Sequence, residues 1–137
     1  MKAAIYSRVM EEGQRNDVQL FFDELAKQKI KPVVFHPFFE QIKGSINLPA
    51  DTATFSASAD LTEEIEFIIS LGGDGTLLDT VTLVRNRNIS IMGINFGRLG
   101  FLASIGREEV KTAVKAIAQR TCIIDKRTMI HMDADIP

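Results

Sequence analysis

The sequence predicts an α/β domain built on an open, mostly parallel β-sheet with helices flanking it. Short apolar runs alternate along the chain with segments of helical periodicity, which is typical of repeated βαβ units. The run from Phe67 to Ile69 is apolar on both faces, as a central strand of a parallel sheet must be. Two glycine-rich segments directly follow apolar runs, where ligands bind in such sheets.

The predicted strands are the short apolar runs between turn signals. They are Ala3–Tyr6, Val33–Phe35, Ile65–Leu71 and Ile89–Ile94, and a final strand region begins at Cys122.

Three segments have the periodicity of amphipathic helices. In the first, Val18, Phe21, Phe22 and Leu25 are spaced at i, i+3, i+4 and i+7, and Lys31-Pro32 ends the helix. The apolar positions of the other two are Leu77, Leu78, Val81 and Val84, and Val110, Ala113, Val114 and Ile117. Between residues 38 and 61, Gly44, Pro49 and a Ser/Thr/Ala-rich stretch predict a loop with little regular structure.

Composition excludes several classes of protein. The chain has 137 residues, of which 45% are hydrophobic and 25% charged, which is too apolar for a disordered protein. The net charge of -2 argues against a nucleic-acid or membrane partner, because both favour a strongly basic face. A single cysteine, Cys122, cannot form an internal disulfide, so a cytoplasmic location is expected. Residues 128–137 alternate like a strand and stop, so we expect the chain to be part of a longer protein.

The first glycine-rich segment is Gly-Gly-Asp-Gly-Thr, from Gly72 to Thr76. Glycines permit positive φ angles and let a ligand approach the backbone N–H groups. Those groups, together with the positive end of the following helix, suit phosphate. A carboxylate pointing at the phosphates would repel them, so Asp74 predicts a different role: accepting a proton from an attacking hydroxyl, or binding a metal ion. The alternative is a tight turn in which Asp74 only caps the helix.

The second segment, Asn95-Phe-Gly-Arg-Leu-Gly-Phe-Leu102, also follows an apolar strand. It adds a cation, Arg98, that could bind phosphate. Alternatively, it is a glycine-containing strand exit whose apolar side chains pack into the core. Two such loops on neighbouring strand ends are harder to explain as turns alone.

The pairing of these two motifs resembles the NAD kinase (ATP-NAD kinase) family. The first motif is shared with phosphofructokinases and with diacylglycerol and sphingosine kinases, but their second glycine-rich segment differs. The resemblance implies a Rossmann-like nucleotide-binding domain of the same type. It also implies transfer of the terminal phosphate of ATP, or of polyphosphate, to the adenosine ribose 2′-hydroxyl of NAD, giving NADP.

The resemblance also implies roles for individual residues. Asp74 is the general base, and Gly75 lies against NAD. A diphosphate-binding turn is formed by Gly72, Gly73 and Thr76, and the apolar wall beside adenine by Leu78 and Phe101. The second loop is lined by Asn95, Gly97 and Arg98, with Arg98 contacting phosphate. Mg²⁺ accompanies the nucleotide phosphate donor, without a dedicated protein metal site.

The chain departs from the family in two respects. Members run to about twice this length and carry a C-terminal β domain that this sequence does not match. We therefore expect residues 1–125 to form the nucleotide-binding domain and residues 126–137 to begin the strand region that leads to the second domain. We also expect this chain alone to be nearly inactive and the full-length protein to be a homo-oligomer. Many members have an arginine shortly after the glycine-rich turn, where this chain has Asp79.

Other functions stay open from the sequence. A lipid or sugar kinase could share the first motif, and a nucleotide-binding module could use Asp74 without catalysis. A dinucleotide-dependent oxidoreductase is disfavoured, because no Gly-x-Gly-x-x-Gly follows Tyr6. Neither His36 nor His131 has partners at metal-ligand spacing, and Cys122 is interpreted as a small buried hydrophobe.

Overall fold

The computed structural model describes residues 1–121, and its centre is a five-stranded parallel sheet. The strands lie in the order β3-β2-β1-β4-β5, and each neighbouring pair is parallel. Their bounds are β1 (Lys2–Tyr6), β2 (Lys31–Phe35), β3 (Ala53–Phe55), β4 (Ile65–Leu71) and β5 (Ser90–Ile94). The predicted open parallel sheet is therefore confirmed. The region from Cys122 onward, with His131 and the predicted final strand, lies outside the described residues.

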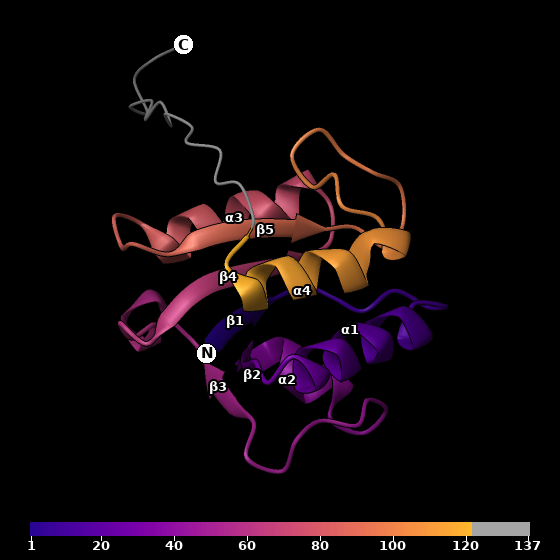
Figure 1. Cartoon of the computed structure of the whole chain (residues 1–137), viewed down its shortest axis with the longest axis horizontal. Helices are drawn as coiled ribbons and strands as arrows, with labels where there is room; N and C mark the ends of the chain where they lie inside the picture. The colour runs from indigo at the N-terminus through magenta and orange to yellow at the C-terminus, as the bar shows by residue number, and fades with distance from the viewer. Residues whose placement is uncertain (122–137) are drawn as a thin grey trace.

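Helices cover both faces of the sheet (Figure 1). The four α-helices are α1 (Arg15–Lys27), α2 (His36–Ile42), α3 (Asp74–Val84) and α4 (Val110–Gln119), with short 3₁₀ turns at Ser58–Asp60 and Arg107–Glu109. Buried side chains of α1, α2 and α4 form one core cluster with one face of the sheet. Val84 of α3 belongs to a second cluster on the opposite face.

Strand β4 contributes side chains to both core clusters, because successive side chains of a strand alternate between its two faces. Phe67, Ile69 and Leu71 join the cluster under α1 and α4, whereas Ile68 joins the cluster that includes α3. Ile65 also joins this second cluster, because the register with β1 shifts between Ile65 and Phe67. Ile68 and Ile69 are both fully buried. Such two-sided burial explains why the sequence shows a continuous apolar run here.

The prediction of a loop between residues 38 and 61 holds for residues 43–52 and is wrong on either side of them. Helix α2 begins at His36 and buries Phe38 and Ile42, and the edge strand β3 buries Phe55. A seven-residue helix provides only one i, i+4 apolar pair, and a three-residue strand cannot show alternation, so neither produced a readable periodicity. Strand β2 also starts earlier than predicted and includes Pro32, which pairs with β1 before the pairing with β3 begins.

The strand order places a reversal between β1 and β4. Strand β1 is followed by α1 on one face, and its neighbour β4 is followed by α3 on the other. Chain segments that leave adjacent strands toward opposite faces open a crevice at the carboxyl ends of those strands, where ligands bind in open α/β sheets. No helix within residues 1–121 is long and apolar enough to cross a membrane.

Truncating a buried side chain of β4 should destabilise the domain. We expect Ile69→Ala to lower the free energy of unfolding by about 2–5 kcal/mol, because it removes buried methyl groups and leaves a cavity. Urea unfolding followed by circular dichroism measures this change. Val9→Ala is the control, because Val9 is half exposed and its truncation should change stability by about 0.5 kcal/mol at most. Equal effects of the two substitutions would contradict the assignment of β4 to the core.

Candidate nucleotide-binding site

A cavity of about 480 Å³ opens at the carboxyl ends of β1, β4 and β5. It therefore lies at the crevice that the strand order creates. Its lining combines the segment after β1, the glycine-rich turn after β4, the start of the loop after β5, and one side chain each from α1 and α2. The lining residues are Ser7, Arg8, Val9, Met10, Glu11, Gln14, Val18, Phe38, Leu71, Gly72, Gly73, Thr76, Asn95, Phe96 and Gly97.

The glycine-rich turn presents backbone N–H groups beside this cavity. Helix α3 begins at Asp74, and the first amide of its hydrogen-bond ladder is that of Leu77, which donates to the Gly73 carbonyl. The four amides from Gly73 to Thr76 come before it and have no carbonyl partner in the helix. Within residues 1–121, none of these four amides has a hydrogen-bond acceptor. Free amides at the positive end of a helix are suited to an anion such as phosphate.

Gly72 shapes the turn without offering its own amide to a ligand. Its N–H donates to the carbonyl of Ile94 at 2.9 Å, which ties the end of β4 to the end of β5. Its φ of +154° is a conformation that side chains rarely adopt. A Cβ at this position would also lie 2.6 Å from Oγ1 of Thr76. Any larger residue would therefore displace the first turn of α3.

Three hydrogen bonds fix the segment after β1, which forms the opposite wall of the cavity. The Ser7 hydroxyl is buried and donates to the Leu71 carbonyl at 2.7 Å. The Gln41 side chain donates to the Arg8 carbonyl at 2.9 Å and accepts from the Met10 amide at 3.3 Å. Helix α2, which the sequence did not predict, thus holds part of the cavity wall.

The Asp74 carboxylate points across to the second glycine-rich segment. Its Oδ1 accepts hydrogen bonds from the amides of Leu102 at 2.8 Å and Ala103 at 2.9 Å, and its Oδ2 accepts from Phe101 at 2.9 Å. Side-chain capping of α3 is absent: the N-cap is Gly73, and Asp74 bonds residues distant in sequence. The interpretation of Asp74 as a simple helix cap is therefore wrong.

The second segment folds so that its amides converge on this carboxylate. Asn95 organises the start of the loop, with its Oδ1 accepting from the Gly97 amide at 3.0 Å and its Nδ2 donating to the Arg98 carbonyl. The Gly100 amide donates to the Ala103 carbonyl at 3.0 Å and closes the turn. A Cβ at Gly100 would lie 2.8 Å from Cγ of Asp74, so glycine is required for this approach.

The hydrogen bonds from the Ala103 and Leu102 amides hold the pKa of Asp74 below its usual range, with a smaller contribution from Phe101. A carboxylate that accepts several backbone N–H bonds is stabilised in its charged form. Asp74 is therefore ionised throughout the physiological pH range. It is a negative group in a fixed orientation, next to a cavity whose amides suit anions.

The structure divides the sequence-predicted site residues into two groups. Those that line the cavity are Gly72, Gly73, Thr76, Asn95 and Gly97. Those that lie outside its lining are Asp74, Gly75, Leu78, Arg98 and Phe101. Leu78 is 44% exposed and Phe101 is 85% exposed. Both lie close to Asp74: Leu78 follows it by one turn of α3, and the amide of Phe101 donates to its carboxylate.

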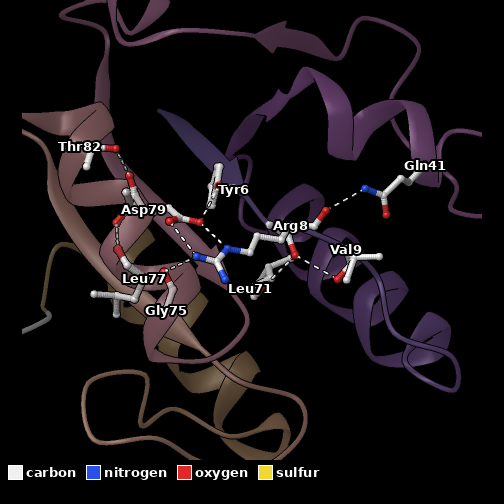
Figure 2. A network of polar contacts seen from close by, with 11 residues as sticks. Tyr6, Arg8, Val9, Gln41, Leu71, Gly75, Leu77, Asp79 and Thr82 are labelled. Atoms are coloured by element: carbon white, nitrogen blue, oxygen red, sulfur yellow. Dashed lines mark hydrogen bonds and ion pairs between the residues drawn. The ribbon is translucent and has the colours of Figure 1, made fainter.

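Sequence reasoning missed a polar network beside the cavity (Figure 2). Arg8 donates from Nε and Nη2 to the two carboxylate oxygens of Asp79, at 2.6 and 2.9 Å. The Tyr6 hydroxyl donates to the same carboxylate at 2.8 Å. Hydrogen bonding from Arg8 lowers the pKa of Asp79, whereas burial and the neighbouring carboxylate raise the pKa of Tyr6 to about 12. No motif spans residues 6, 8 and 79, so this network has no local signal in the sequence.

Comparison with known proteins is consistent with this geometry. The family model of the ATP-NAD kinase N-terminal domain matches residues 5–122. The chain belongs to this family. The predicted resemblance is therefore confirmed, and it extends from the end of β1 through β5 and includes both glycine-rich segments.

Individual relatives agree with the family assignment. The chain is 33% identical to the NAD kinase of Flavobacterium psychrophilum over 96% of this chain and 45% of that protein. It is 34% identical to the NAD kinase of Cytophaga hutchinsonii over the same shares. The chain thus spans slightly less than half the length of these curated relatives.

A solved structure with the same fold is a yeast NADH kinase complexed with NADH. It superposes with a TM-score of 0.64 at 19% identity and covers 85% of this chain and 38% of that one. This likeness supports the α/β nucleotide-binding fold of the ATP-NAD kinase domain.

The carboxylates of this ATP-NAD kinase domain do not gather into a metal site. Within residues 1–121 there is no group of three or more His, Cys, Asp or Glu side chains placed to hold a metal ion. Three backbone amides donate to the Asp74 carboxylate, and Arg8 and Tyr6 donate to that of Asp79. A divalent cation at this site would need oxygen ligands from the bound nucleotide.

The hydrogen bonds to Asp74 predict its titration. In an NMR pH titration of the carboxyl carbon, we expect Asp74 to titrate below about 3.9, the ordinary value for aspartate. Because the folded-state pKa is lowered, the contribution of these bonds to stability is complete above the ordinary value. It is lost as the pH falls through the lowered pKa.

A pair of glycine variants tests the cause of this shift. In Gly100→Ala, the added Cβ would displace Asp74 from the loop amides, so its pKa should move back toward the ordinary value. Gly44→Ala is the matched control, because a Cβ there meets nothing within 4 Å. An equally low Asp74 pKa in both variants would show that the loop amides do not cause the shift.

Proposed function

We propose that this chain supplies the nucleotide-binding part of an NAD kinase. The enzyme transfers the terminal phosphate of ATP, or of polyphosphate, to the 2′-hydroxyl of the adenosine ribose of NAD and forms NADP. Family membership supports the reaction class. The observation that carries the proposal is the position of the Asp74 carboxylate, which is fixed between two glycine-rich segments beside a cavity with free backbone amides.

The phosphate donor occupies the cavity. The free amides between Gly73 and Thr76 bind the phosphate oxygens, and the positive end of α3 adds to their attraction. The absence of side chains at Gly72 and Gly73 lets the phosphates approach the backbone. Mg²⁺ bound to the nucleotide would supply positive charge and so lower the charge that the cavity must neutralise.

The Asp74 carboxylate receives the acceptor hydroxyl. A carboxylate offers about four lone-pair positions, and three are used by the loop amides, two on Oδ1 and one on Oδ2. The remaining position on Oδ2 accepts the hydrogen bond of the ribose 2′-hydroxyl. The hydroxyl oxygen attacks the terminal phosphorus, the bond from phosphorus to the leaving phosphate oxygen breaks, and the hydroxyl proton passes to Asp74.

The low pKa of Asp74 indicates when this proton moves. A carboxylate with a lowered pKa is a weak base toward a free alcohol, but the alcohol becomes acidic once its oxygen bonds to phosphorus. Phosphoryl transfer proceeds through a loose transition state in which positioning dominates. Asp74 therefore orients the hydroxyl first and takes its proton late.

The exposed apolar side chains beside Asp74 bind the acceptor. Leu78 and Phe101 lie close to the carboxylate and are accessible to solvent. They provide an apolar surface for the adenine ring, whose ribose then meets Oδ2. Arg98 is exposed outside the cavity lining, so its phosphate contact would be with a nucleotide that extends beyond the cavity. We also propose a cytoplasmic location and a homo-oligomeric assembly for the full-length protein.

Replacing the carboxylate tests the catalytic role. In protein expressed from the complete gene, we expect Asp74→Asn to reduce NADP formation by about 10²–10⁴-fold, because asparagine keeps the shape but cannot take the proton. An enzyme-coupled NADP assay measures the rate. Asp23→Asn, an exposed carboxylate of α1, is the control and should retain full activity. Unchanged turnover in Asp74→Asn would favour a nucleotide-binding module in which Asp74 catalyses nothing.

Ligand binding separates the NAD kinase from a lipid or sugar kinase. In the same protein, we expect NAD at 100 times its dissociation constant to stabilise the fold by about 2.7 kcal/mol. Thermal-shift titrations with NAD, ATP, a diacylglycerol and fructose phosphate compare the candidates. A shift with diacylglycerol or fructose phosphate and none with NAD would reject the assignment of the acceptor.

A further inference from the structure

We propose that Arg8 is the cation that binds the polyphosphate of the phosphate donor, and that Asp79 holds its guanidinium in position for this contact. The inference rests on the proposed function of the cavity as the site of the phosphate donor. Arg8 follows β1 by two residues and lines the cavity. It is the only basic side chain among the described residues that line it.

Asp79 and Gly75 fix one side of the guanidinium. The Nε and Nη2 groups donate to the Asp79 carboxylate, and Nη2 also donates to the Gly75 carbonyl at 3.3 Å. Both partners belong to α3, whereas Arg8 comes from the segment after β1. The side chain therefore bridges the strand-order reversal on which the cavity is built.

The Nη1 group of Arg8 remains available for a ligand. It makes no hydrogen bond within residues 1–121, and Figure 2 shows it pointing away from Asp79. Nη1 would lie 3.4 Å from a Cβ at Gly75, so the guanidinium sits directly against the glycine-rich turn. An arginine held by a carboxylate on one edge keeps its other N–H groups in a fixed direction, which favours planar recognition of phosphate.

Asp79 is itself held in place, which makes the arrangement specific. The Tyr6 hydroxyl donates to Oδ2 of Asp79 at 2.8 Å, and Tyr6 is buried. Such an anchored pair costs less side-chain entropy than two free surface chains.

The strand order indicates which substrate Arg8 contacts. The glycine-rich turn follows β4, and β4 lies between β1 and β5. Arg8 approaches the turn from the β1 side, whereas the Asp74 carboxylate faces the loop after β5. The phosphate donor therefore lies on the Arg8 side, and the acceptor hydroxyl on the Asp74 side. The transferred phosphoryl group lies between them.

The test compares the Michaelis constants of the two substrates in protein expressed from the complete gene. We expect Arg8→Gln to raise the KM for ATP about tenfold to hundredfold, as for loss of a charge-assisted hydrogen bond, with the KM for NAD within about twofold. Arg8→Lys should recover part of the loss. Asp79→Asn should raise the KM for ATP by a smaller factor, and should add little in the Arg8→Gln background because it acts through Arg8.

Arg120→Gln is the matched control. Arg120 makes a somewhat more exposed arginine–carboxylate pair with Glu66, with bonds of 2.8 and 2.9 Å, near the opposite end of β4. Both KM values should be unchanged in this variant. Unchanged KM values in Arg8→Gln would overturn the proposal and leave Arg8 as a structural tether. A rise in the KM for NAD alone would overturn the assignment to the phosphate donor.

A binding measurement keeps this inference separate from the proposed reaction. If the wild-type protein forms no NADP, the NAD kinase assignment fails, but calorimetric titration with ATP and with inorganic triphosphate still tests Arg8. Weaker binding of both probes to Arg8→Gln, with normal binding to Arg120→Gln, supports the polyphosphate contact. Equal binding to wild type and Arg8→Gln overturns it. Circular dichroism shows whether each variant is folded, and Arg8→Lys replaces Arg8→Gln if the latter is not.

Discussion

The site depends on one constraint of the backbone, the reversal of strand order between β1 and β4. Because the chain leaves these neighbouring strands toward opposite faces of the sheet, their exits separate and a cavity opens between them. The same adjacency brings three segments distant in sequence to one edge. Ser7 donates to the carbonyl of Leu71, and the Gly72 amide donates to Ile94, so β1, β4 and β5 are joined at the cavity itself.

The site also depends on the three backbone amides that donate to Asp74. A carboxylate beside a turn whose free amides suit an anion is electrostatically unfavourable there unless its charge is stabilised. Three backbone N–H groups of the second glycine-rich segment stabilise it. Gly100 is what allows this approach. The two motifs recognised in the sequence are thus halves of one structure: the first supplies the carboxylate and the second supplies its hydrogen-bond donors.

The sequence predicted those strands, helices and motifs that produce a repeated or local pattern. The four strands with extended apolar runs, and the helices with several apolar positions on one face, were all found, because burial on a sheet imposes a period that can be read. Helix α2 and strand β3 were missed because each is too short to show a period. Arg8 was missed for a different reason: its partner Asp79 is 71 residues away, and only the pairing of β1 with β4 brings them together.

The glycine-rich turn has charges of opposite sign on its two sides: Asp74 faces the β5 side and Arg8 the β1 side. In the reaction that we propose, the negative and positive groups therefore border different parts of the path of the phosphoryl group. If the carboxylate faced the cavity, it would repel the phosphates that the amides attract. The loop after β5 prevents this by holding the carboxylate on its own side. The separation of charges is therefore produced by the sheet. Gly75 and Gly100 allow Arg8 and Asp74 to lie close to the backbone, as the proposed reaction at one phosphorus atom requires.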